Sequence, residues 1–155
     1  MPELPEVETL VRALAPRLSG TVLVRVHEWT PGVFSVAPDV DRNGLDGSRI
    51  LGLRRRGKLI LVELDRGLLG IHLRMTGRLL VEALDSAPGR HTHVAFDLEN
   101  GHEQLRYVDP RRFGRIEYHS PESLAQSRFY STLGPEPLEL DAGGFAARLG
   151  TAGAV

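Results

Sequence analysis

The sequence contains no cysteine, so neither a disulfide framework nor a thiolate zinc site can form within its 155 residues. It also lacks any apolar run close to the roughly 18 residues that a membrane-spanning helix requires. The chain begins Met1-Pro2-Glu3, and an acidic residue stands where a secretory signal would carry basic ones. We therefore expect a cytoplasmic monomer with no membrane partner and no metal of its own.

Lysine is almost absent, because Lys58 is the only one and every other basic residue of the chain is an arginine. Arginine keeps its proton at any working pH, whereas lysine can lose one. A lone lysine is therefore a candidate for proton transfer or for a compact phosphate contact. The alternative is that one lysine stands among the arginines by chance.

The net charge is only −1, which taken alone argues weakly against a nucleic-acid partner. The charge is, however, unevenly distributed: residues 49–115 carry an excess of Arg and Lys over Asp and Glu, and both ends of the chain are acidic. A basic middle segment indicates one face suited to a polyanion, with a solvated sheet face as the alternative.

Hydrophobic periodicity predicts one helix followed by strands. Apolar residues repeat at helical spacing between Val7 and Leu14, which predicts a helix over residues 5–15 that Pro16 disrupts. We expect a mainly β fold with α: a two-layer antiparallel β-sandwich of about eight strands, flanked by this N-terminal helix and a short C-terminal helical segment. The predicted strands are residues 21–27, 49–55, 58–64, 68–73, 78–83, 91–98, 104–108 and 115–118.

The pattern loosens after Ser120 into segments rich in proline, glycine and alanine, with a weak helical stretch at residues 145–149. We expect an N-terminal β-sandwich domain over residues 1–138. Residues 139–155 are then a linker and the start of a further element.

The N-terminus carries a candidate nucleophile. Removal of Met1, which a small second residue permits, exposes the secondary amine of Pro2. Attack by that amine on a sugar C1′ ends in an iminium ion, which stays positive without a proton and so accepts electrons. The adjacent Glu3 can supply a proton. On these residues alone, the simpler interpretation is that Met-Pro-Glu begins a helix.

Three histidines lie on or between predicted strands. His91 and His93 alternate along one strand, which would direct both to one face, but no third ligand is spaced near them. Phosphate contact therefore fits them, and His72, better than a metal.

Met75, Arg111 and Phe113 are suited to contact with stacked bases. Arg111 and Phe113 stand two apart after a proline and pair a guanidinium with an aromatic ring. Such side chains insert into base stacks. The alternative is that Met75 and Phe113 are core residues.

Together these motifs resemble the formamidopyrimidine-DNA glycosylase and endonuclease VIII family. Residues 2–8 read Pro-Glu-Leu-Pro-Glu-Val-Glu, as the family begins after its initiator methionine. The resemblance continues in order and at family-like spacing, so it covers nearly the whole chain. It runs through residues 55–58, 72–77, 91–93, 109–114 and 133–138.

The resemblance implies a role for each candidate residue. Pro2 would be the Schiff-base nucleophile, Glu3 the proton donor to the deoxyribose ring, and Lys58 a phosphate contact and an acid in the elimination steps. The implied DNA contacts are His72, Met75, His91, Arg111 and Phe113. Three of them, Met75, Arg111 and Phe113, would form a wedge that fills the space of an extruded nucleotide.

The implied activity is base-excision repair of damaged double-stranded DNA without a cofactor in this chain. The glycosidic bond is cleaved first, and β- and δ-elimination at the abasic sugar follow. Leu4 and the Met, Arg and Phe wedge resemble the oxidised-purine branch of the family. The expected substrates are therefore 8-oxoguanine and formamidopyrimidines.

The resemblance also implies a second half, absent from these residues, with a helix–two-turn–helix module and a four-cysteine zinc finger. We expect zinc there and none here. We further expect the 155-residue chain alone to bind DNA weakly and to have little or no glycosylase activity. Two alternatives are a non-catalytic DNA-binding β-sandwich and a metal-dependent hydrolase that uses His91, His93 and nearby carboxylates.

Overall fold

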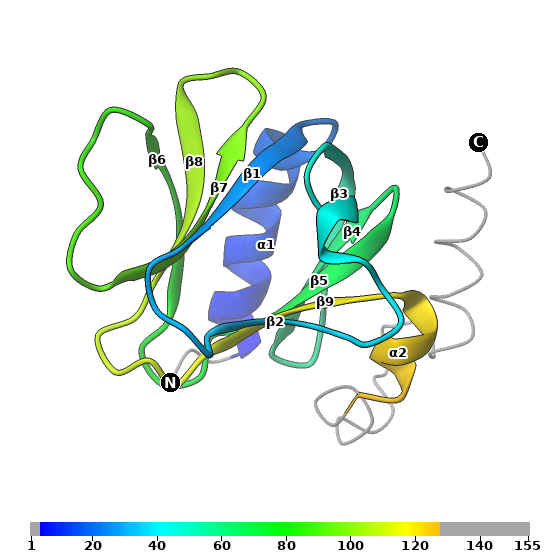
Figure 1. The fold of residues 1–155 in the computed structure, drawn as a ribbon. Helices are drawn as coiled ribbons and strands as arrows, with labels where there is room; N and C mark the ends of the chain where they lie inside the picture. The colour runs from blue at the N-terminus through cyan, green and yellow to red at the C-terminus, as the bar shows by residue number, and fades with distance from the viewer. Residues whose placement is uncertain (1–3, 128–155) are drawn as a thin grey trace.

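The computed structural model, drawn as a ribbon in Figure 1, describes residues 4–127. Pro2, Glu3, the predicted domain boundary at residue 138 and the predicted helical stretch at 145–149 lie outside them. The helical elements are α1 (Leu4–Leu18), the 3₁₀ helix η1 (Arg42–Gly44) and α2 (Pro121–Ala125). The strands are β1 (Val22–Glu28), β2 (Phe34–Val36), β3 (Ser48–Arg56), β4 (Leu59–Leu64), β5 (Gly67–His72), β6 (Arg78–Ala83), β7 (Thr92–Leu98), β8 (Glu103–Val108) and β9 (Arg115–His119).

The strands are hydrogen-bonded in the order β2-β9-β5-β4-β3-β1-β7-β8-β6. Neighbours are antiparallel except β2 and β9, which are parallel. β1 and β3 share only two residue pairs, Val22 with Arg49 and Leu23 with Ser48. This short seam joins two halves of the sheet: the β1 half, made of β1, β7, β8 and β6, and the β9 half, made of β3, β4, β5, β9 and β2.

The two halves face each other across one hydrophobic core. Phe34 of β2 and Phe96 of β7 meet edge to face with ring centroids 6.3 Å apart, although their strands are distant in the sheet order. The predicted mainly β sandwich with an N-terminal helix is therefore confirmed, and a short helix, α2, follows the strands earlier in the chain than the stretch predicted at 145–149. The eight predicted strands differ from the observed ones by no more than one residue at either end.

Helix α1 packs along β3 and stands between the two halves in the view of Figure 1. Its buried stripe extends from Val7 to Leu18, and Leu18 is fully buried. The helix continues past Pro16, although proline cannot donate the backbone hydrogen bond of that turn. Because Leu14 and Leu18 are one helical turn apart and both face the core, their burial offsets the missing bond.

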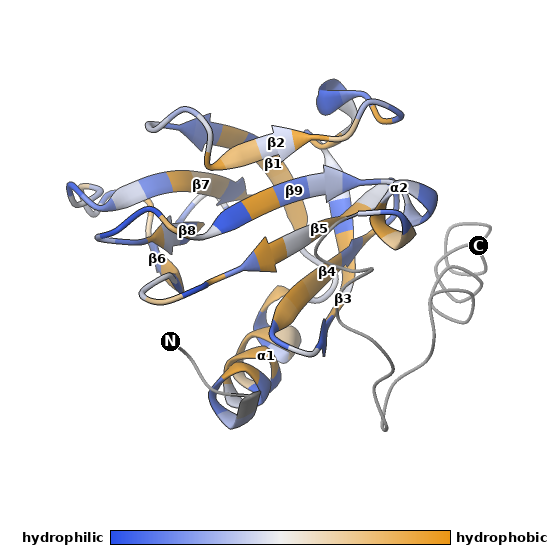
Figure 2. Ribbon diagram, turned by 90° about the horizontal axis from the view of Figure 1, so that it is seen from below, coloured by the Kyte–Doolittle hydropathy of each residue, from blue (hydrophilic) through white to orange (hydrophobic). Residues whose placement is uncertain are grey.

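Strand β4 is buried along its whole length, and Figure 2 shows it in hydrophobic colour. Its single charged residue is Glu63, whose Oε1 lies 3.0 Å from Nε of Arg54 on β3. A carboxylate in such a strand requires a partner, because an unpaired charge in the interior is costly. Arg54 is therefore committed to the sheet rather than to a ligand.

Three elements, β2, η1 and α2, escaped the sequence prediction. β2 has three residues, too few for a recognisable alternation, and it exists because it pairs with β9. α2 begins at Pro121 after the capping residue Ser120. No helix within residues 4–127 is long and apolar enough to cross a membrane.

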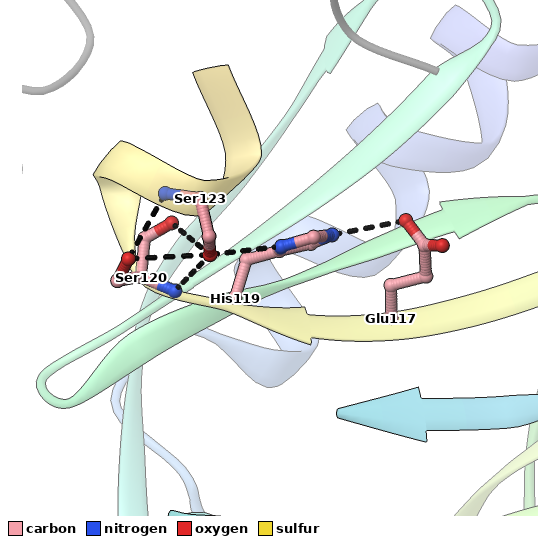
Figure 3. Close-up of polar contacts among 4 residues, drawn as sticks. All are labelled: Glu117, His119, Ser120 and Ser123. Atoms are coloured by element: carbon pink, nitrogen blue, oxygen red, sulfur yellow. Dashed lines mark hydrogen bonds and ion pairs between the residues drawn. The ribbon is translucent and has the colours of Figure 1, made fainter. Parts of the chain in front are cut away.

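A polar cluster shown in Figure 3 fastens α2 to β9. His119 Nδ1 lies 2.9 Å from Ser123 Oγ, and its Nε2 lies 2.9 Å from Glu117 Oε1. The same order of groups occurs in hydrolase triads. Here, however, Ser123 Oγ accepts the backbone N–H of Ser120 in a capping box. The cluster is thus a helix cap, and Ser120 Oγ also donates to Asp39.

Leu18→Ala is expected to lower the free energy of unfolding by about 3 kcal/mol, because it leaves a cavity between α1 and the sheet. Urea denaturation measures the change. Leu84→Ala, at a leucine that is 40% exposed, is the matched control and should cost less than about 1 kcal/mol. Equal losses in the two variants would show that α1 does not contribute to the core as described.

Candidate nucleic-acid interface

The strand registers of the β9 half bring Lys58 and His72 to the same end of the sheet. Lys58 lies in the turn between β3 and β4, and the next residue, Leu59, pairs with His72 at the end of β5. His72 pairs in turn with Arg115 at the start of β9. Three adjacent strands therefore present basic residues at one end.

Strands of the β1 half also begin or end at this end of the sheet. Arg78, which begins β6, and Thr92, which begins β7, both pair with Val108 at the end of β8. Two loops then cross between the halves here. The first crossover loop, residues 73–77, leads from β5 to β6, and the second crossover loop, residues 109–114, leads from β8 to β9.

The buried carboxylate of Asp109 ties the two crossover loops together. Thr76 of the first loop donates its hydroxyl to Asp109 at 2.5 Å, and the Tyr107 hydroxyl donates at 2.6 Å. The backbone N–H groups of Arg111 and Gly114 each donate at 3.1 Å. Burial alone would raise the pKa of Asp109, but these hydrogen bonds lower it to about 2. The carboxylate is thus charged and fully occupied as an acceptor.

Close backbone packing fixes the ends of both loops on Tyr107. A Cβ added to Gly77 would lie 2.5 Å from the Leu73 carbonyl oxygen and 3.0 Å from the Tyr107 ring. A Cβ added to Gly114 would lie 1.9 Å from the Tyr107 hydroxyl. Both positions therefore require glycine.

The loops expose apolar tips. Met75 is 46% exposed and Phe113 is 49% exposed, so core packing is not their role. The residues before them, Arg74 and Arg112, have φ of 59° and 57°. Left-handed backbone costs a non-glycine residue roughly 1–2 kcal/mol. Since both loops retain it, the surrounding hydrogen bonds hold the two tips in place.

Arg111 and Phe113 lie together, as their spacing predicted. The guanidinium carbon of Arg111 is 5.5 Å from the centroid of the Phe113 ring, within the range of a cation–π contact. The cation and the ring form one exposed unit on the second crossover loop.

The environment of His72 is positively charged. Burial lowers the pKa of the His72 imidazole, and the charges of Arg74 and Lys58 lower it further. His72 is therefore uncharged at neutral pH and can donate a hydrogen bond without adding to the local positive charge. The effect of Lys58 on the ring also indicates that Lys58 is close to His72.

An ion pair holds the beginning of α1 near Lys58. Arg55 Nε donates to Glu8 Oε1 at 2.6 Å, and Glu8 also accepts from Arg12 at 2.9 Å. These hydrogen bonds lower the pKa of Glu8. Because Arg55 lies close before Lys58 in sequence, the first turns of α1 approach the β3–β4 turn. The helix that follows Pro2 and Glu3 thus begins at the same end of the sheet as the crossover loops.

His91 and His93 have different environments. His93 is buried: its ring nitrogens lie 2.7 Å from Thr30 Oγ1 and 2.6 Å from the carbonyl oxygen of Asp109. The prediction of a phosphate contact by His93 was therefore wrong. His91 remains partly exposed, and its carbonyl oxygen accepts the Asp109 backbone N–H at 2.9 Å. Within residues 4–127, no group of three or more His, Asp and Glu could hold a metal ion.

Arginine side chains make this end of the sheet basic. Arg55 and Arg56 are buried, and Arg106 donates to backbone carbonyl oxygens inside the β1 half, so these three contribute little to the exposed charge. Exposed arginines at this end come instead from the two crossover loops, their borders and the β6–β7 loop. They are Arg74, Arg78, Arg90, Arg111, Arg112 and Arg115.

A β-sandwich with exposed arginines, an aromatic tip and a methionine tip on adjacent loops is typical of proteins that bind a nucleic acid and distort its base stack. The sequence model of the formamidopyrimidine-DNA glycosylase N-terminal domain matches residues 1–116. The chain belongs to the formamidopyrimidine-DNA glycosylase family.

Individual relatives agree with this assignment. The chain is 42% identical over 140 residues to formamidopyrimidine-DNA glycosylase of Acidiphilium cryptum, covering 90% of this chain and 50% of the relative. It is 45% identical over 142 residues to that of Moorella thermoacetica, covering 90% and 51%. The Lactococcus lactis protein, solved with FAPY-dG-containing DNA, superposes with a TM-score of 0.77 at 32% identity, covering 87% and 51%. The chain therefore spans about half the length of these relatives.

Asp109→Asn is expected to destabilise the fold by about 3 kcal/mol, because the amide replaces one accepting oxygen with a donor facing other donors. The wild-type contribution is present above the unfolded pKa and is lost between about pH 4 and about pH 2. Urea denaturation at several pH values measures both effects. Asp46→Asn, at an exposed position, should change the free energy of unfolding little. Equal effects of the two substitutions would contradict the role of Asp109 in tying the two crossover loops together.

His72 should make stability depend on pH in the opposite direction from a paired histidine. Its pKa is lowered in the folded state, so below the unfolded value of 6.5 the unfolded chain binds the proton more readily. The free energy of unfolding should therefore fall from about pH 7.5 to about pH 5.5, and less so in His72→Gln. His102→Gln, at an exposed histidine, is the control; the same pH dependence in wild type and His72→Gln would refute this.

Proposed function

We propose that this chain is the nucleophile-bearing half of a base-excision-repair DNA glycosylase and abasic-site lyase acting on oxidised purines. One observation carries the proposal. Lys58, His72, both crossover loops and the start of the helix that follows Pro2 lie at a single basic end of the sheet. A nucleophile, a proton donor and a wedge must act on the same nucleotide, so this convergence is what the chemistry requires.

The amine of Pro2 is the nucleophile. Its nitrogen bonds to the sugar C1′ while the bond from C1′ to the damaged base breaks, and the base leaves with the electron pair of that bond and takes up the proton that the amine loses. Glu3 protonates the ring oxygen O4′ as the C1′–O4′ bond opens, which leaves an iminium ion. Loss of a C2′ proton then breaks the C3′–O bond with phosphate as the leaving group, and a second elimination follows at C5′.

Lys58 and His72 act on the sugar–phosphate backbone. Lys58 supplies a positive charge to the phosphate and a proton in the elimination steps. His72 is held neutral, so it donates a hydrogen bond to a phosphate oxygen. His91, at the β1 side of the second crossover loop, contacts a further phosphate.

Met75, Arg111 and Phe113 form the wedge. Their exposure and the strained loops that present them support insertion into a duplex, where they fill the space of an extruded nucleotide. An apolar pocket lies beside the first crossover loop, lined by Leu73 and Gly77 of that loop together with Val7 and Leu10 of α1.

Support for oxidised purines comes from relatives. The family is named for formamidopyrimidine, and the Lactococcus lactis structures contain FAPY-dG or an abasic site in DNA. Half of such a protein lacks whatever the other half contributes to the DNA cleft, so we propose that this chain alone turns over slowly or not at all. We propose that any zinc is bound by cysteines outside this sequence, which contains none.

Borohydride reduction on an abasic-site duplex tests the nucleophile, because it converts the iminium ion into a stable covalent adduct. The chain with Met1 removed should give an adduct, N-acetylated chain should give none, and Pro2→Gly should give less. Addition of the other half of a relative in trans should increase the yield.

Lys58→Arg is a decisive control, because this variant contains no lysine. Any adduct that it forms comes from the N-terminal amine. Absence of an adduct from the unblocked chain, with and without the other half, would favour the non-catalytic DNA-binding β-sandwich. Loss of strand cleavage by this chain on adding a chelator would instead favour the metal-dependent alternative, which acts through metal-activated water and forms no adduct.

A further inference from the structure

The exposed indole of Trp29 lies outside the wedge and the Lys58 region. Trp29 follows β1 directly and is 46% exposed. The ring of His27 stacks on it, with centroids 5.7 Å apart and planes at 14°. His27 is itself fixed, because its Nε2 lies 3.0 Å from Asp97 Oδ2. The indole is therefore a supported platform rather than a loose side chain.

A surface pocket opens next to this platform. Trp29 and Thr30 line one side, and Pro88, Gly89 and Arg90 of the β6–β7 loop line the other, with Thr92. Among residues 4–127, none of those that line the pocket has a carboxylate. An aromatic ring beside an exposed guanidinium suits a planar group that carries an anion, because the ring stacks and the guanidinium binds the anion.

Hydrogen bonds connect residues of the pocket with residues of the candidate interface. Thr30 Oγ1 lies 2.7 Å from His93, which contacts the carbonyl oxygen of Asp109 at 2.6 Å. On the other side, Arg90 Nε lies 3.4 Å from the ring of its neighbour His91. The pocket and the second crossover loop therefore share one buried support.

We propose that this pocket binds an unpaired nucleotide of a DNA strand, with its base stacked on Trp29 and its phosphate on Arg90. A base inside a duplex is stacked on both faces and cannot offer one to the indole, so the ligand is an unpaired nucleotide. This inference rests on the proposed function for its origin: the nick left by β- and δ-elimination creates strand ends that can unpair. The pocket would hold such an end beside the wedge.

The test uses the fact that Trp29 is the only tryptophan of the chain, so its fluorescence reports on this pocket alone. The chain is titrated with a blunt duplex and with the same duplex carrying a three-nucleotide single-stranded tail. The tailed duplex should quench the emission and bind roughly tenfold more tightly, as expected for one base–aromatic stack. Equal affinities and unchanged emission with the tailed duplex would overturn the inference.

Variants separate the pocket from general electrostatics. Trp29→Leu, followed through labelled DNA, should abolish the tail preference, and Arg90→Gln should reduce it. Arg66→Gln removes an equal charge at the opposite end of β5 and should preserve it. A tail preference that survives in Trp29→Leu would contradict the stacking. Borohydride trapping by the unaltered chain reports separately on the proposed function: an adduct without quenching defeats only this inference, whereas quenching without an adduct defeats only the lyase.

Discussion

The buried carboxylate of Asp109 is the contact on which the candidate interface depends. Both crossover loops pass between the two halves of the sheet, and each bears a residue with left-handed backbone and an exposed apolar tip. Neither conformation is favourable for an isolated loop. Asp109 binds Thr76 in one loop and the backbone of the other, so the strain in both is held by one charged group. The pKa of Asp109 is low because the same four donors stabilise its charged form.

Around Asp109, some arginines are bound within the fold and others are exposed. Arg54 and Arg55 are bound to carboxylates within the fold, and Arg106 supports backbone carbonyls. Other arginines are exposed around the crossover loops, although further exposed arginines lie elsewhere among residues 4–127. A chain of nearly neutral net charge therefore has a strongly basic end. The neutral His72 fits this arrangement, because a further cation beside Lys58 and Arg74 would be repelled.

Much of the fold could be predicted, because long alternating strands and the stripe on α1 are strong periodic signals. β2 and α2 escaped because their short segments depend on β9 and on a cap. Within the site, the motif at residues 109–114 drew attention to Arg111 and Phe113, while the residue that organises it, Asp109, received no role. An aspartate that directly follows a strand and precedes a proline was the available signal. The phosphate contact predicted for His93 was wrong because the side chain is buried, and a two-residue spacing does not reveal burial.

The seam between β1 and β3 has a mechanical consequence. It consists of two residue pairs and lies at the end of the sheet away from Lys58 and Asp109. The two halves of the sandwich are therefore joined at one end by two residue pairs and at the other end by the crossover loops, which also carry the exposed tips. The candidate interface is therefore also one of the two places where the layers are joined, so a substitution in its loops is expected to change the stability of the fold as well as binding.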